Sequence, residues 1–278
     1  MVGSARRMAL LLGLFFVVAL PGVASANHSW GGYHWARTSN PFTLKLGDNV
    51  SSQWDSILGT TSSDWSVSTV LDTSIVTGQA VKRLCSATAG RDEICNGRYG
   101  QNGWLGVASI WVSGLHITQG TVKVNDTYFS MSQYNTTAWR NLVMCQEVGH
   151  TLGLDHQDTT FDNLNLGTCM DYTNNPTGGG LNGTLDNQQP NQGDYDELRC
   201  IYEYPTVTLS TSTHACTGTG TGHLDTTTTV GQPTPTGAAA ESRSGWGREV
   251  ARLNGGHTSV FVRDLGAGQQ IITFVIWA

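Results

Sequence analysis

The sequence is poor in charged residues. Asp, Glu, Lys and Arg make up 13% of its 278 residues, and the formal net charge is −6. No cluster of Lys and Arg occurs along the chain, so neither charge nor patterning favours a nucleic-acid partner. Gly, Ser, Thr and Asn are abundant instead, which is typical of a loop-rich extracellular protein.

Several catalytic and metal-binding patterns are also missing. The sequence has no C-x-x-C pair, which disfavours a zinc finger. It has no G-x-S-x-G, which leaves a serine hydrolase unsupported. Beyond the first apolar run, no apolar stretch is long enough to span a bilayer.

The N-terminus has the pattern of a secretory signal. Arg6 and Arg7 precede the apolar run Met8–Leu20, and Ala24–Ala26 has the small residues of a cleavage site. The run is short for a membrane anchor, which is the alternative. We therefore predict that residues 1–26 are a signal peptide, that the mature protein is secreted, and that it has no membrane contact after cleavage.

All six cysteines lie in the exported part of the chain. An even number in an oxidising compartment predicts disulfides, and six cysteines allow fifteen pairings. The first two cysteines flank a short polar loop. The next two lie in the motifs at residues 145–158 and 167–172, and the last two then remain to pair with each other. The predicted pairs are Cys85–Cys95, Cys145–Cys169 and Cys200–Cys216.

The composition divides the mature chain into three parts. Residues 27–204 alternate apolar segments with turns, as a folded domain does. Residues 205–240 are rich in Thr, Ser and Gly and predict a linker or extension. Residues 241–278 predict a small β segment whose strands, 258–263 and 270–277, form a hairpin. Because a lone hairpin is marginal in water, we expect it to pack on the main domain or to belong to a small β module.

Within the main domain, strands come first and a long helix follows, which predicts an α+β fold. The expected strands are Phe42–Leu46, Trp65–Val76, Gly106–Val112 and Leu115–Val124. The expected helices are a short one after a cap at Asp48–Ser51, a long one from Thr136 or Thr137 to Leu152, and a last one over Asp194–Tyr202.

The long helix carries the stretch CQEVGHTLGLDHQD, residues 145–158. Gln146 and His150 are four residues apart and share one face of a helix. Gly153 allows a sharp turn, after which His156 returns as a third donor. Glu147 lies beside these donors. The spacing predicts a metal site with Gln146, His150 and His156 as ligands.

Catalytic zinc needs three protein ligands and an open position for water, whose proton a carboxylate accepts. Glu147 is placed to be this general base. The amide oxygen of Gln146 is a weaker zinc ligand than imidazole, but it needs no deprotonation. The alternative is that Gln146 belongs to a hydrogen-bond network and that no metal binds.

A second motif follows at Gly167–Tyr172, GTCMDY. Together with the first motif, it resembles the metzincin zinc metalloproteases, in which a Met-turn follows the ligand motif. The resemblance implies that Met170 forms the floor of the site and that Tyr172 binds the metal or stabilises the oxyanion. Glutamine at the first ligand position is similar to the gametolysin-like branch of that family.

The resemblance covers about residues 30–204. It implies a two-subdomain metalloprotease fold, with a twisted mixed sheet, a backing helix and an active-site helix, and a small C-terminal subdomain with the Met-turn and a helix. It also implies a monomeric, secreted endopeptidase that uses Zn²⁺ and binds an extended peptide along an edge strand near residues 106–120. The alternative is a non-catalytic exported binding or adhesion protein with a degenerate metal site.

Overall fold

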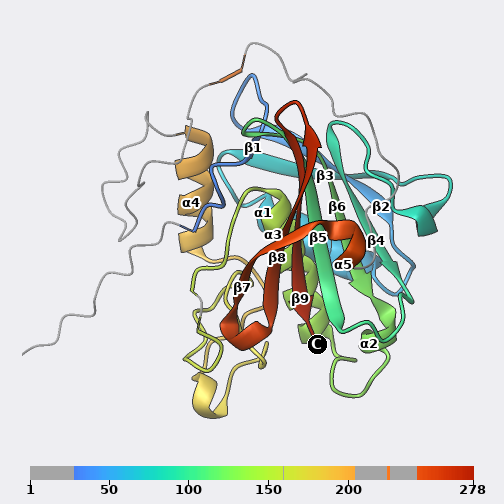
Figure 1. Ribbon diagram of the computed structural model, residues 1–278. Helices are drawn as coiled ribbons and strands as arrows, with labels where there is room; N and C mark the ends of the chain where they lie inside the picture. The colour runs from blue at the N-terminus through green and yellow to red at the C-terminus, as the bar shows by residue number, and fades with distance from the viewer. Residues whose placement is uncertain (1–27, 159, 204–223, 226–242) are drawn as a thin grey trace, which may run out of the picture.

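A computed structural model describes residues 28–158, 160–203, 224–225 and 243–278. Its centre is a mixed sheet with the strand order β3-β2-β4-β6-β5-β9-β8-β7, and β1 pairs with β6 (Figure 1). The strands are β1 His34–Trp35, β2 Phe42–Asn49, β3 Leu71–Thr77, β4 Arg91–Gly97, β5 Trp104–Ser113, β6 His116–Asn125, β7 Arg248–Leu253, β8 Thr258–Gly266 and β9 Gln269–Trp277. The predicted α+β class is confirmed.

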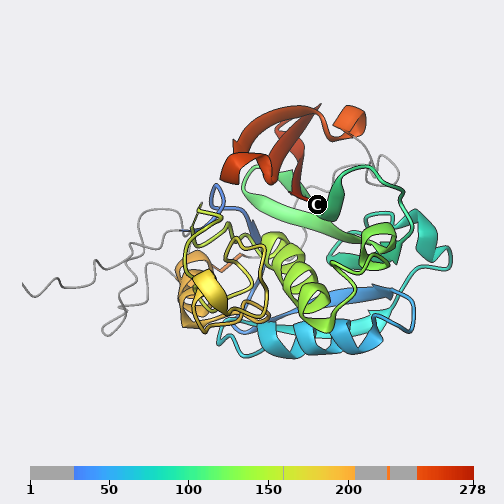
Figure 2. The ribbon, with the colours of Figure 1, turned by 90° about the horizontal axis from the view of Figure 1, so that it is seen from below.

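Two helices pack against each other and against the sheet (Figure 2). α1 contacts β3, and α3 contacts β5 and β6. The α-helices are α1 Asp55–Trp65, α2 Asp126–Phe129, α3 Thr137–Thr151, α4 Gln192–Glu203 and α5 Arg243–Trp246, and the 3-10 turns are η1 Lys82–Leu84, η2 Gly180–Asn182 and η3 Asn254–Gly256.

Local signals set the limits of α3. The Thr136 hydroxyl accepts a hydrogen bond from the backbone N–H of Trp139, which caps the helix. At the other end Gly153 has φ 97°, a left-handed conformation that favours glycine. A side chain there would lie 2.2 Å from the carbonyl oxygen of Tyr33. The predicted helix therefore has the expected limits.

The chain between α3 and α4 is mostly irregular and lies beside α3 (Figure 2). The Cys145–Cys169 disulfide ties it to the helix, and the Cys85–Cys95 disulfide links η1 to β4. These two predicted pairs are present. The third predicted pair includes Cys216, which lies outside the described residues, as do the predicted signal peptide and nearly all of the predicted linker.

The C-terminal hairpin continues the main sheet. β9 pairs antiparallel with β5, from Trp104 opposite Trp277 to Ser113 opposite Gln269. An edge strand was expected near residues 106–120, which lie in β5 and β6. This expectation is wrong for the folded chain, because β5 lies between β6 and β9, and β6 lies between β4 and β5.

The expected strand Trp65–Val76 is also wrong in its first half. Trp65 ends α1, a turn follows, and β3 begins only at Leu71. Ile57, Leu58 and Trp65 of α1 are buried, so packing of this face stabilises a helix that its sequence predicts poorly. In the described part of the chain, no helix has both the length and the apolar character needed to cross a membrane.

Candidate functional site

The predicted ligand residues meet at the C-terminal half of α3. Gln146 and His150 lie one turn apart, and both are buried. After the turn at Gly153 the chain brings His156 back, and the ring centroids of His150 and His156 are 4.7 Å apart. The structure thus places the two histidines in contact, and Gln146 lies on the same helix face.

Hydrogen bonds orient these side chains. His150 Nδ1 donates a hydrogen bond to the carbonyl oxygen of Leu154 at 2.9 Å. In the neutral ring, the lone pair that could bind a metal then lies on Nε2. In the described part of the chain, neither His150 Nε2 nor His156 Nε2 has a hydrogen-bond partner, although both atoms are buried. The amide nitrogen of Gln146 donates to the carbonyl oxygen of Asp171 at 2.9 Å, so the amide oxygen remains for another partner.

Burial controls the protonation of the site. Burial and the neighbouring His156 lower the pKa of His150 to about 3, so the ring is neutral at physiological pH and suited to bind a metal. Burial raises the pKa of Glu147 well above its usual range, although the backbone N–H of Ala108 opposes this shift. Both pKa shifts arise because burial removes the water that would solvate the charged form of each side chain.

Glu147 lies between α3 and β5. It is fully buried, and a Cβ on Gly106 of β5 would lie 2.3 Å from Glu147 Oε1. Glycine at position 106 therefore makes room for the carboxylate. Neither carboxylate oxygen has a hydrogen-bond partner of good geometry among the described residues, which is unusual for a buried polar group.

Met170 packs against α3 at Gly149. A Cβ on Gly149 would lie 2.4 Å from Met170 Sδ and 2.8 Å from Trp65 Cζ2, so a glycine lets the methionine approach the helix backbone. The Cys145–Cys169 disulfide fixes the neighbouring residue to the same helix. Met170 therefore packs against the backbone of α3.

Tyr172 lies on the other side of His156. The two rings meet edge to face, with centroids 5.2 Å apart. Tyr172 also lines a pocket of about 520 Å³ together with Gln146 and, from the C-terminus, Ile276 and Ala278. Tyr172, the residue predicted to bind the metal or stabilise the oxyanion, is thus next to both a predicted ligand histidine and a cavity.

Sequence reasoning missed one residue of the site, Phe274 of β9. Its ring stacks on that of His150, with centroids 4.1 Å apart and 9° between the planes. The Trp30 ring meets the Phe274 ring edge to face, with centroids 3.8 Å apart. The apolar run of β9 predicted a buried strand. Nothing in it indicated that this strand lies over the histidines, because the pairing with β5 joins segments far apart in the sequence.

The donor set fits a metal ion. A neutral imidazole at His150, a second imidazole at His156, an amide oxygen and a nearby carboxyl group suit zinc, and the buried ring nitrogens have no hydrogen-bond partner among the described residues. Among the described residues, no three His, Cys, Asp or Glu side chains are grouped to hold a metal ion. The third predicted donor, Gln146, is an amide and does not belong to these residue types.

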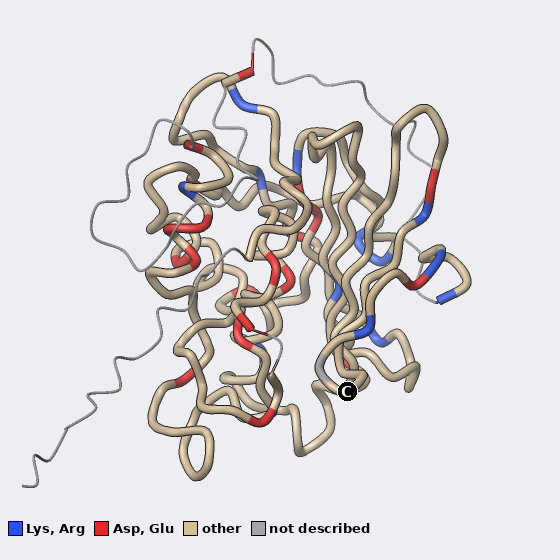
Figure 3. The backbone as a smooth tube through the Cα atoms, turned by 60° about the vertical axis from the view of Figure 1, so that its left-hand side comes forward, with Lys and Arg blue, Asp and Glu red and all other residues tan. Residues whose placement is uncertain are grey.

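The charge around the site favours a cation. Segment 141–203 contains many Asp and Glu residues and a single basic residue, Arg199, whereas most Lys and Arg residues lie elsewhere (Figure 3). An excess of acidic residues of this kind favours cations over anions.

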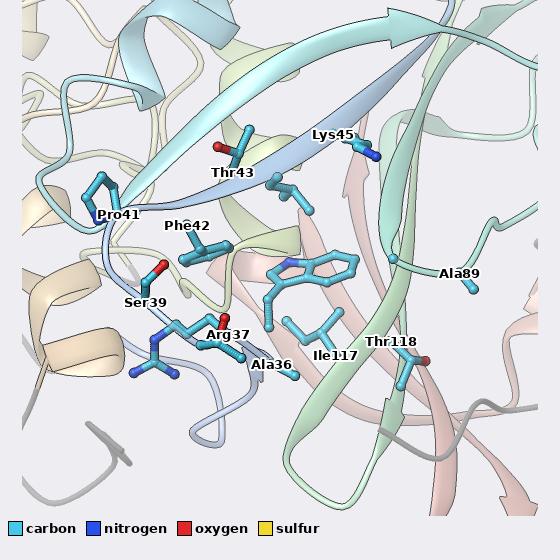
Figure 4. Close-up of a pocket in the computed structure, with 14 residues that line it drawn as sticks. Ala36, Arg37, Ser39, Pro41, Phe42, Thr43, Lys45, Ala89, Ile117 and Thr118 are labelled. Carbon is cyan, nitrogen blue, oxygen red and sulfur yellow. The ribbon is translucent and has the colours of Figure 1, made fainter. Parts of the chain in front are cut away.

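A second pocket, of about 630 Å³, lies away from this site. Phe42, Ile117 and Thr118 line it, with Arg37 and Lys45 at its margin (Figure 4). None of the predicted site residues lines it, so we do not assign it to the candidate site.

No model of a protein family matches the sequence, and a comparison with curated proteins gives no match.

Proposed function

We propose that the protein is a secreted zinc-dependent endopeptidase of the metzincin type. The observation that supports this proposal is the contact between the buried His150 and His156 rings at the helix that also carries the buried Gln146 and Glu147. A random cluster of buried polar groups would satisfy its hydrogen bonds internally, whereas here the ring nitrogens lack partners within the described ranges.

The residues then have separate roles. Gln146, His150 and His156 would hold zinc, which supplies a Lewis acid that polarises the scissile carbonyl and activates water. Glu147 accepts a proton from water and gives it to the leaving nitrogen, a task suited to a carboxyl group with a raised pKa. Tyr172 donates a hydrogen bond to the developing oxyanion.

A specific observation favours the second candidate function, a non-catalytic binding protein. His150 and Glu147 have no solvent exposure, and Phe274 covers the first of them. A protein that uses this fold only for binding has no need for an open site. It also has no need for a carboxylate at position 147, which weighs against this candidate.

The test of the proposal is the variant Glu147→Gln. We expect it to bind zinc like the parent and to lose peptide hydrolysis by at least about 100-fold, because the amide cannot accept the proton. Zinc is measured by mass spectrometry of the protein, and hydrolysis of casein is followed over long incubation, with and without a chelator.

Glu203→Gln on α4 is the matched control, since it makes the same chemical change away from the site. It should leave both zinc binding and hydrolysis unchanged. Parent protein that takes up no zinc when zinc is supplied would contradict the proposal, and equal hydrolysis by Glu147→Gln would contradict the assigned base.

A further inference from the structure

The outer edge of β5 is the surface on which an extended peptide would lie beside the candidate site. β9 occupies this edge along its full length, from Trp104 to Ser113. The pairing is antiparallel and uses main-chain hydrogen bonds, which is how a bound peptide adds a strand to a sheet.

The register brings β9 to the catalytic groups. Phe274 lies opposite Ala108, the residue whose backbone N–H points to Glu147. Ile272, Phe274 and Ile276 alternate along the strand and all pack into the main core next to α3. Val275, on the other face, packs instead with Trp104 and other residues of a separate cluster. β9 therefore presents Phe274 and Ile276, two residues apart, to the site and its pocket, as an extended peptide presents alternate side chains.

The side chains of β9 and its end lie against the site and line the adjoining pocket. The Phe274 ring stacks on His150. Further along, Ile276, Trp277 and Ala278 line the pocket that Gln146 and Tyr172 also line. The C-terminal residue is held there, because the backbone N–H of Ala278 donates to the carbonyl oxygen of Gly103 at 2.6 Å.

A second contact holds the hairpin on the opposite side of the site. His257, just before β8, stacks on Phe161 with ring centroids 4.3 Å apart, and Phe161 in turn contacts Tyr172. The hairpin thus bridges from β5 to the loop that carries the Met-turn. His150 is fully buried and the Phe274 ring covers it, so a peptide gains access to His150 only when β9 moves.

We propose that the C-terminal hairpin β8–β9 is a built-in pseudosubstrate, which keeps the protein latent until β9 leaves the edge of β5. This inference rests on the proposed function. The occupant is the chain's own strand, and extended peptides with bulky apolar side chains at alternate positions would compete for the same edge.

The first experiment is Phe274→Ala in the full chain. Loss of the stacked ring weakens the closed form, so we expect hydrolysis of a short unstructured peptide to rise at least about tenfold. Zinc should be removed faster by a chelator, and the amides of β9 should exchange hydrogen faster. A merely structural role of Phe274 would lower activity. If Phe274→Ala does not fold, Phe274→Leu keeps most of the apolar volume and is used instead.

The second experiment locks the strand. Ser109 and Thr273 are paired across β5 and β9, and their hydroxyl oxygens are 2.9 Å apart. Adding Ser109→Cys and Thr273→Cys to the Phe274 variant creates a reducible crosslink. We expect the oxidised form to be inactive and mild reduction to restore the raised activity. Ser109→Ala with Thr273→Ala in the same background, with and without reductant, is the control.

The outcomes separate the two proposals. Activation by the Phe274 substitution that the oxidised lock abolishes supports the pseudosubstrate. A folded variant no faster than the parent, or equal activity of the oxidised and reduced lock, overturns it and leaves the proposed function intact. If no form hydrolyses peptide, the proposed function fails. The rate of zinc removal then decides, because equal rates in the locked and unlocked forms would overturn the covering role of β9.

Discussion

Gln146 is the residue in which this site departs from a three-histidine site. Its amide nitrogen is engaged by the carbonyl oxygen of Asp171, which fixes the side chain with its oxygen free for a ligand. An amide oxygen is neutral and a poorer donor to zinc than an imidazole nitrogen. In the proposed metal site, Gln146 would therefore be well oriented but would bind zinc more weakly than a histidine would.

We predict that Gln146→His tightens zinc binding by about tenfold or more, because an imidazole replaces the amide. A competition titration with a chromogenic chelator measures the dissociation constant. Gln133→His is the control, since Gln133 lines the same pocket but is exposed and is not a proposed ligand. Equal or weaker zinc binding by Gln146→His would contradict the ligand assignment.

Asp92 is a second buried carboxyl group near α3, and sequence reasoning did not single it out. Its Oδ2 accepts a hydrogen bond from the Thr151 hydroxyl at 2.6 Å, and a Cβ on Gly120 would lie 2.7 Å from its Oδ1. Burial raises the pKa of Asp92 to about 7. The folded state therefore prefers the neutral acid.

This preference sets the sign of a pH effect. Because the folded pKa is raised above the unfolded value of 3.8, the stabilisation is complete below about pH 4 and is lost as pH rises through about 7. Asp92→Asn imitates the neutral acid at every pH. We expect little change in the free energy of unfolding at pH 4 and a gain on the order of 3 kcal/mol at pH 8. Urea titrations at the two pH values measure it, and destabilisation at pH 8 would contradict it.

At the scale of elements, the sequence predicted α3 best. Thr136 and Gly153 are local capping signals, so the helix limits follow from the chain itself. The i, i+4 spacing also placed Gln146 and His150 one turn apart on this helix, whereas their role as metal ligands stays a prediction. α1 was partly missed because its small polar residues favour no helix, and packing against α3 decides its structure.

The packing of α3 on the Met-turn leads to a prediction at this scale. Gly149→Ala places a methyl group 2.4 Å from Met170 Sδ, so we expect a loss of about 1–3 kcal/mol of stability from overpacking. Thermal unfolding followed by circular dichroism measures it.

Gly59→Ala on α1 is the matched control. A Cβ there meets no atom within 4 Å, so the same change should stabilise the helix by about 0.5–1 kcal/mol. Equal effects of the two substitutions would mean that Met170 does not pack against α3 as described.

At the scale of the whole molecule, the arrangement of sheet edges could not be predicted from the sequence. The hairpin was expected from its alternation and turn, but its partner strand lies more than a hundred residues earlier in the chain. Pairing over such a distance depends on the complete core and leaves no local signal. The position of Phe274 over His150 is a consequence of that pairing.

The hairpin also changes which strand forms the edge of the sheet on this side. β7, the outermost strand, has the sequence REVARL, with Arg248, Glu249 and Arg252 along it. β5 has the sequence WLGVASIWVS and carries no charge. Charged residues on an edge strand oppose pairing with another molecule, whereas an uncharged apolar edge promotes it. The complete sheet is thus protected against self-association on this side.

We therefore predict that deletion of residues 243–278 converts the protein to dimers or larger species through the exposed edge of β5. Sedimentation velocity at matched concentrations measures this against the full chain, which we expect to be monomeric. Ser109→Lys in the truncated chain is the control, because a charge on the new edge should restore the monomer. A truncated protein that is folded and monomeric without this lysine would mean that β5 does not need the hairpin to protect its edge.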